Sequence, residues 1–241
     1  MTVTYGECRP VSYCQFNRFP GETGFAEGSA SGYGCSRFIV PSWAMKIPVS
    51  LPSILWIASV PCSAQTLLIG LYDYADLSAK ETRRLTETAD RAFAHSGIHL
   101  VWSHCRGSLA AVSGATCEGE MQINEIVVRL QPGGQRSSHD GRLGHTMVTA
   151  EGGYYASVFV GSVRAQATGF GIAFDLLMGY AVAHEVGHCL LGPGHSYAGL
   201  MRGDWNRKDA SEITRLSLHL TKQEARKAVA RLRHAEGAAG R

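Results

Sequence analysis

The sequence predicts an α/β domain of the α+β type, in which a mixed sheet packs against helices. Strand-like, helix-like and strand-like segments follow one another between Gln65 and Ser103, which is typical of a right-handed crossover between parallel strands. An almost uniformly apolar segment at 172–191 predicts a long helix buried under a sheet. The 241 residues, 45% hydrophobic and 18% charged, describe an ordinary globular protein.

The first 64 residues differ in composition from the rest. Residues 1–44 are rich in Gly, Ser and Tyr without a sustained period, and we expect an upstream extension of the reading frame or a disordered arm. Residues 45–64 have a short basic start, an apolar core and small residues before Gln65, as in a secretory signal peptide. The apolar run is short and broken by prolines, so we expect no stable membrane anchor. These features predict a secreted protein with its folded domain at 65–241.

The elements of this domain can be placed from periodicity and end signals. Ser78 and Glu81 have the spacing of a capping box, and an amphipathic helix follows them. Thr221 and Glu224 have the same spacing before a final helix. Strands are expected at 66–72, 98–103, 123–130, 146–150 and 155–163. The last two flank Gly152-Gly153 and predict a hairpin at the edge of the sheet.

The densest chemistry lies at the end of the long apolar segment, in His184-Glu185-Val186-Gly187-His188. Histidines four residues apart lie on one face of a helix, so both imidazoles can reach one metal ion. Glu185 lies about 100° round the helix from His184, beside the metal, where it can act as a general base toward water. A catalytic zinc also needs a third protein ligand and an open position. His195 is the best candidate for that ligand.

The five-residue pattern alone also occurs as ordinary packing in buried helices. Three further features follow it, namely Gly192, His195 three residues later, and Met201 in a short loop. Together these residues resemble the metzincin zinc peptidases, most closely their matrixin-like branch, over about twenty residues from Ala183 to Arg202. The resemblance implies one catalytic Zn²⁺, held by His184, His188 and His195, with Glu185 as general base and Met201 as the Met-turn residue beneath the metal.

The resemblance also implies a fold. We expect a metzincin-like twisted mixed sheet with an antiparallel edge strand, a long active-site helix, and a small C-terminal subdomain with a final helix. The upper subdomain would comprise 65–192 and the lower 193–241.

The chain departs from the family pattern between the second histidine and the glycine. Three residues, Cys189-Leu190-Leu191, stand there where the family has two. The simplest explanation is a helix one residue longer, with the following turn re-aimed by Gly192, Pro193 and Gly194. If His195 did not reach the metal, Asp204 or Asp209 could supply an oxygen ligand instead.

A substrate-binding strand is a further implication of the resemblance. In metzincins an antiparallel edge strand lies above the zinc and pairs with extended substrate. The equivalent place in the order of elements falls on Ala156, Ser157, Val158, Phe159 and Val160. An exposed edge holds a peptide through its unpaired backbone groups, and the alternative is a covered edge without a ligand.

Other cysteines and histidines have simpler interpretations. Cys105 and Cys117 flank a small-residue loop and could form a disulfide in an exported protein. Cys189 directly follows a proposed ligand, and we expect a buried small hydrophobe there. The segment with His139, Asp140 and His145 carries no complete ligand set and is expected to be a solvated loop.

The function that the sequence predicts is a secreted zinc-dependent endopeptidase acting on peptides or proteins, and we expect it to be a monomer. A net charge of +3 gives no indication of a nucleic-acid partner. Two alternatives stay open: a secreted zinc-stabilised binding module without turnover, and a zinc amidase acting on cell-wall peptides.

Overall fold

The computed structural model of the chain describes residues 12–16, 64–106, 117, 121–133, 142–149 and 152–239. All of these residues belong to one compact unit. The expected signal peptide therefore lies outside the described residues, apart from Ala64, and so do His139 and Asp140. Within the described residues, no helix is both long enough and apolar enough to cross a membrane.

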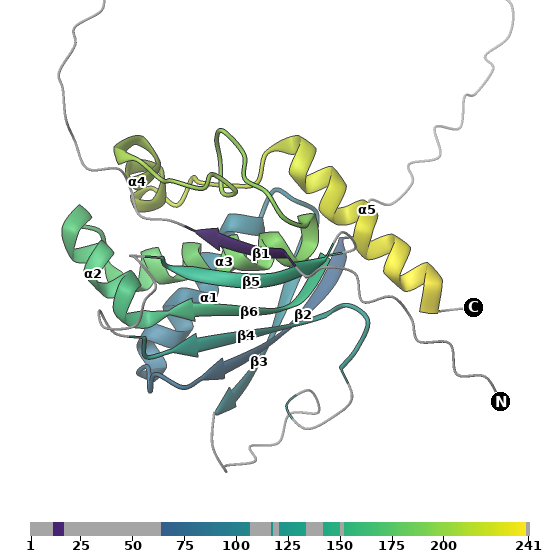
Figure 1. Ribbon diagram of the computed structural model, residues 1–241, viewed down its shortest axis with the longest axis horizontal. Helices are drawn as coiled ribbons and strands as arrows, with labels where there is room; N and C mark the ends of the chain where they lie inside the picture. Colours follow the sequence, from purple (N-terminus) through teal and green to yellow (C-terminus); the bar gives the residue numbers. More distant parts are fainter. Residues whose placement is uncertain are drawn as a thin grey trace, which may run out of the picture. The chain divides into compact units, whose positions relative to one another are not determined.

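A six-stranded mixed sheet forms the centre of the unit, in the order β1-β5-β6-β4-β2-β3 (Figure 1). Its strands are β1 (Ser12–Phe16), β2 (Gln65–Asp73), β3 (Ile98–Arg106), β4 (Glu125–Gln131), β5 (Gly144–Thr149) and β6 (Gly152–Phe159). The pairs β2–β3, β2–β4 and β4–β6 are parallel, whereas β5 runs antiparallel to β6 and β1 antiparallel to β5.

The helices are α1 (Ala79–Phe93), α2 (Val160–Phe170), α3 (Phe174–Leu191), α4 (Arg207–Thr214) and α5 (Lys222–Ala239). Figure 1 shows α1 and α3 together behind the sheet. Gly179 allows the two helices to approach closely. A Cβ at this position would lie 2.6 Å from the Leu85 carbonyl oxygen, so any larger residue would push the helices apart. The expected fold class is confirmed: a mixed sheet with an antiparallel strand, a long buried helix and a final helix in the C-terminal part.

Local signals explain where the helices begin. Ser78 and Glu81 form the expected capping box at α1, with each side chain bonded to the other residue's backbone N–H. Thr221 and Glu224 do the same before α5. The apolar face of α1 is buried mainly against α3, and nearly all of α3 is buried. Each buried Leu, Val or Phe side chain contributes roughly 1.5–3 kcal/mol, so tertiary burial stabilises α3 more than its sequence propensity does.

The segment expected as a strand at 155–163 is only partly one. β6 ends at Phe159, and Val160 is the first residue of α2. Valines and aromatics favour a strand here, but Val163 and Ala167 bury one face of a helix that packs on α3. Tertiary packing therefore overrides local preference, and the prediction for 160–163 is wrong.

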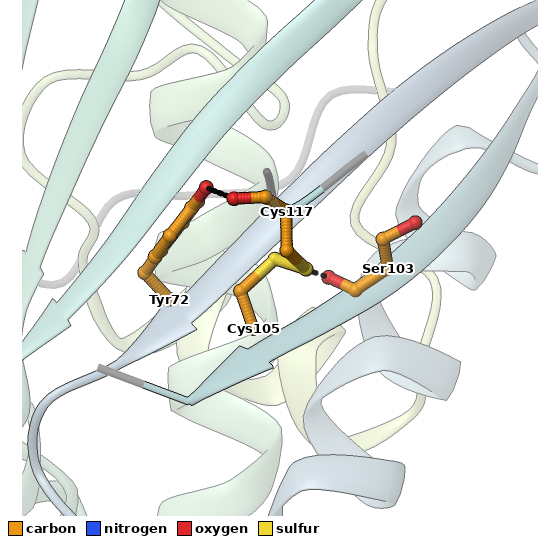
Figure 2. Close-up of a disulfide and its surroundings, with 4 residues drawn as sticks. All are labelled: Tyr72, Ser103, Cys105 and Cys117. Carbon is orange, nitrogen blue, oxygen red and sulfur yellow. Dashed lines mark hydrogen bonds between the residues drawn. A yellow bond between two sulfur atoms is a disulfide. The ribbon is translucent and has the colours of Figure 1, made fainter. Parts of the chain in front are cut away.

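The β3–β4 connection is tied to the sheet by a disulfide. Cys105, near the end of β3, is bonded to Cys117, with 5.6 Å between their Cα atoms. Figure 2 shows this bond beside Tyr72, whose hydroxyl donates a hydrogen bond to the Cys117 carbonyl oxygen at 3.1 Å. Cys189 is a free cysteine and buried.

Candidate metal centre

Three histidine side chains converge at the C-terminal end of α3. His184 and His188 lie one helical turn apart and are fully buried, with 3.0 Å between their Nε2 atoms. His195 follows the helix, and its Nε2 lies 3.2 Å from that of His188. Their ligand atoms all lie within 4.8 Å of one another, and no other His, Cys, Asp or Glu group in the described part of the chain is so arranged. The structure therefore brings all three predicted ligands together.

Hydrogen bonds behind two of the rings set their tautomers. His184 Nδ1 lies 2.7 Å from the Leu200 carbonyl oxygen, and His188 Nδ1 lies 3.3 Å from that of Gly192. A carbonyl oxygen only accepts, so each Nδ1 carries the proton and each Nε2 turns a lone pair toward the centre. Lone pairs facing each other at this distance repel unless a cation lies between them. The donor set therefore fits a metal ion.

The protonation states of the ligands agree with this arrangement. Burial lowers the pKa of His184 well below its usual value and that of His188 to about 4. Burial also lowers the pKa of His195, while the nearby charge of Asp204 acts in the opposite direction. Neutral imidazole is the form that binds metal, so these side chains are ready for a metal at neutral pH.

The turn after α3 accommodates the extra residue of this chain. α3 continues to Leu191, and the chain then turns through Gly192 at φ +85° and Gly194 at φ +112°. Both values lie where only glycine is unstrained. The longer helix and the two glycines together return His195 to the centre.

Neither aspartate considered as an alternative ligand belongs to the cluster. Asp209 is buried and accepts a hydrogen bond from the Asn206 backbone N–H at 2.8 Å, and Arg202 Nε lies 3.6 Å from it. It thus forms the capping box of α4. Asp204 acts on His195 through its charge and is not part of the metal-binding group.

Met201 lies directly against α3. A Cβ at Gly187 would be 2.3 Å from the Met201 Sδ atom, so only glycine at this helix position lets the thioether approach so closely. Trp205 is also buried there, and its ring meets His184 edge-on at 5.7 Å between centroids. The resemblance implied Met201 beneath the site, whereas Trp205, an aromatic in a charged loop, carries no spacing signal that would have predicted its position.

Glu185 is fully buried beside the histidines. Its Oε2 accepts a hydrogen bond from Thr146 Oγ1 on β5 at 2.5 Å, whereas its Oε1 has no hydrogen-bond partner. Burial raises the pKa of Glu185 to about 8, against a smaller lowering by the Thr146 hydrogen bond. Thr146 lies 39 residues before Glu185 and belongs to no motif, so its contact with Glu185 could not be predicted from the sequence.

The strand predicted to bind substrate is not an edge strand. Ala156, Ser157, Val158 and Phe159 lie in β6, which pairs with β4 on one side and β5 on the other, and Val160 lies in α2. The edge placement is wrong because a backbone paired on both sides has no free ladder to offer. Its hairpin partner β5 lies one strand further out, between β6 and the edge strand β1, and Thr146 of β5 is paired in register with Cys14 of β1.

His145 does not lie in a solvated loop as expected. It is part of β5, and its ring centroid lies 5.5 Å from that of Phe159.

The chain resembles solved structures of low sequence identity. No family model matches the chain, and no curated protein matches its sequence. Among solved structures, the chain is similar to metalloproteinase-II from Bacteroides fragilis, with 14% identity, 70% of this chain and 54% of that chain covered, and a TM-score of 0.47. It is also similar to an archaemetzincin from Methanopyrus kandleri, with 15% identity, 72% of this chain and 99% of that chain covered, and a TM-score of 0.45. The chain thus spans about half of the Bacteroides fragilis protein. Likeness at this level carries no information about activity.

Proposed function

We propose that the chain is a zinc-dependent endopeptidase. His184, His188 and His195 would hold one Zn²⁺, and Glu185 would act as general base. The observation that carries the proposal is a buried carboxylate with one free oxygen beside three converging imidazoles. A site that only stabilises the fold has no need of such a base.

The ligand count also favours catalysis over a structural role. Structural zinc sites are almost always closed by four protein ligands, whereas catalytic sites keep one position open. The described residues supply three, and His195 is exposed, which leaves one side of the centre accessible. This supports turnover rather than a zinc-stabilised binding module.

The chemistry divides between the metal and Glu185. Held by the three histidine nitrogens, a zinc ion would supply a Lewis acid for a substrate carbonyl group and for a bound water. Glu185 Oε1, the free oxygen, accepts the proton of the attacking water and delivers it to the leaving amine. The buried position raises the pKa of Glu185 to about 8, which suits a group that must take up and release a proton near neutral pH.

For the substrate, we propose an extended peptide that pairs with the outer edge of β5. β5 carries Thr146, which contacts Glu185, so a strand on this edge passes beside the general base. β1 of the same chain pairs antiparallel with β5 over five residue pairs, which indicates that the edge accepts an extended segment. Peptide binding here would require β1 to leave.

Two finer assignments rest on the sequence. Gly187, the His195-Ser196 pair and Leu200-Met201 favour the matrixin-like branch of the metzincins. Residues 45–64 favour secretion, and maturation at Gln65 would also remove β1 from the edge of β5.

The test is hydrolysis of a mixed peptide library by the full chain and by a form beginning at Gln65, with zinc content assayed on the same samples. Glu185→Gln keeps the shape of the side chain but removes the base, and we expect turnover to fall by at least about 100-fold with zinc still bound. Retained hydrolysis in this variant would contradict the assignment. Bound zinc without cleavage by the unmodified protein would favour a binding module or a non-peptide substrate.

A further inference from the structure

We propose that β5 holds the general base in its working position, with Thr146 as a positioning residue and Gly144 providing the space for the free carboxylate oxygen. This inference rests on the proposed function, because it concerns how Glu185 is placed for the reaction. It concerns a part of the chain that carries no motif and that lies far from the helix in sequence.

The Thr146 hydroxyl lies between two oxygens of Glu185. Its Oγ1 is 2.5 Å from the carboxylate Oε2 and 3.1 Å from the backbone carbonyl oxygen of the same residue. A hydroxyl has one hydrogen to donate, and hydrogen bonds to a carboxylate are the shorter and stronger ones. The hydrogen therefore goes to Oε2. Thr146 is fully buried, so no exposed water competes for this contact.

The consequence is that the two carboxylate oxygens become different. Oε2 is engaged by Thr146, whereas Oε1 is buried without a partner. A glutamate side chain otherwise moves among many rotamers, and one anchored oxygen removes most of that freedom. The anchored carboxylate thus keeps Oε1 as its single fixed acceptor.

Gly144 acts on the other oxygen. A Cβ at this position would lie 2.7 Å from Glu185 Oε1 and 2.7 Å from the Ser157 carbonyl oxygen of β6. Neither the carboxylate nor the neighbouring strand could remain in place. Residues two apart in a strand point to the same face, so Gly144 and Thr146 together form a cradle for one carboxylate.

The kinetic test compares Thr146→Val, which has nearly the same shape without the hydroxyl, with Thr146→Ser, which keeps it. We expect Thr146→Val to lower kcat by about 10-fold or more with KM and zinc content unchanged, because only the placement of the base is lost. Thr146→Ser should restore most of the rate. The matched control is Thr88→Val on α1, which removes another buried hydroxyl, one that donates to the Arg84 carbonyl oxygen at 2.8 Å away from the site.

A second readout does not depend on activity. In metal-free protein, Thr146→Val should lower Tm by at least about 2 °C more in the wild-type background than in a Glu185→Ala background, since the carboxylate contact exists only in the first. The Thr88→Val effect should be equal in both backgrounds.

The outcomes separate the two proposals. A wild-type protein that binds zinc but cleaves no peptide overturns the proposed function, and this inference with it. An active wild-type protein whose kcat is unchanged by Thr146→Val, or equal Tm effects of that substitution in both backgrounds, overturns the positioning role alone.

Discussion

The metal centre has a helix half, His184 and His188 on α3, and a loop half, His195. Different parts of the structure hold the two halves in place. His184 and His188 belong to α3, are fully buried, and are each held from behind by a backbone carbonyl. His195 is exposed and belongs to an irregular segment that follows the glycine turn at 192–194. The spacing of the first pair follows from helix geometry alone, whereas the position of the third depends on everything that anchors its loop.

The loop is anchored by contacts from several elements. The Ser196 backbone N–H donates to the Met201 carbonyl oxygen, and its hydroxyl donates to Glu224 on α5. Leu200 N–H donates to the His219 carbonyl oxygen at 2.9 Å. Such a loop can shift by local changes that would not move a buried helix. We therefore expect the two halves to respond differently to substitution.

The largest effect is expected for the helix half. His188→Ala removes a buried ligand at the middle of the cluster, and we expect zinc affinity to fall by more than about 100-fold, beyond the range seen for changes behind a ligand, with loss of hydrolysis. Zinc content after dialysis and a competition titration measure it. His104→Ala, which replaces an exposed histidine on β3, serves as control. Zinc content equal to wild type would exclude His188 as a ligand.

A smaller loss is expected for the loop half. His195→Ala leaves the buried pair and its carbonyl partners intact, and solvent can reach the vacated position. We expect residual zinc binding that is weaker than wild type but tighter than in His188→Ala, with hydrolysis strongly reduced. The same competition titration compares the two variants. If His195→Ala lost as much affinity as His188→Ala, the distinction between the halves would fail.

The contact between the halves can be tested at Gly187. Gly187→Ala would place its methyl group against Met201 Sδ, and overpacking of this kind costs about 1–3 kcal/mol. For a domain of this size we expect Tm to fall by roughly 2–10 °C. Combining it with Met201→Ala should relieve the clash, so the double variant should be more stable than the sum of the single changes predicts. Additive thermal shifts would show that the two residues do not touch.

The smallest effect concerns the metal-free protein and pH. The pKa of His188 is about 4 when folded and 6.5 in the unfolded reference, and that of His184 is also lowered. The unfolded chain therefore binds more protons in this window, and stability is lost as pH falls from 6.5 toward 4.

Glu185 acts on the alkaline side of the same profile. Its pKa is raised from 4.5 to about 8, so the folded state binds the extra proton and stability is lost as pH rises between these values. Thermal unfolding in a chelator from pH 5 to 8 should show a maximum. Glu185→Gln should flatten the alkaline side by about 3 °C or more and steepen the acid side, where Glu185 opposes the histidines. A flat profile for wild type would contradict both contributions.

The helix half of the metal centre could be predicted from the sequence more fully than the loop half. His184, Glu185 and His188 are recognisable because helix geometry converts a spacing of four residues into a shared face. His195 could be named from its place after Gly192, but its arrival at the centre depends on glycine conformations that spacing alone does not specify. Trp205, Thr146 and Gly144 escaped prediction because they meet the site only through packing.

The sequence by itself determined the order of most elements, the capping boxes of α1 and α5, and the two buried ligands with their base, since these depend on residues within a few positions of one another. The tertiary structure alone decided that β6 lies inside the sheet, that Val160 begins a helix, and that β5 cradles Glu185. Strand neighbours and cross-strand contacts join residues tens of positions apart. No local period records such pairings, because they arise from burial of the whole sheet against α3.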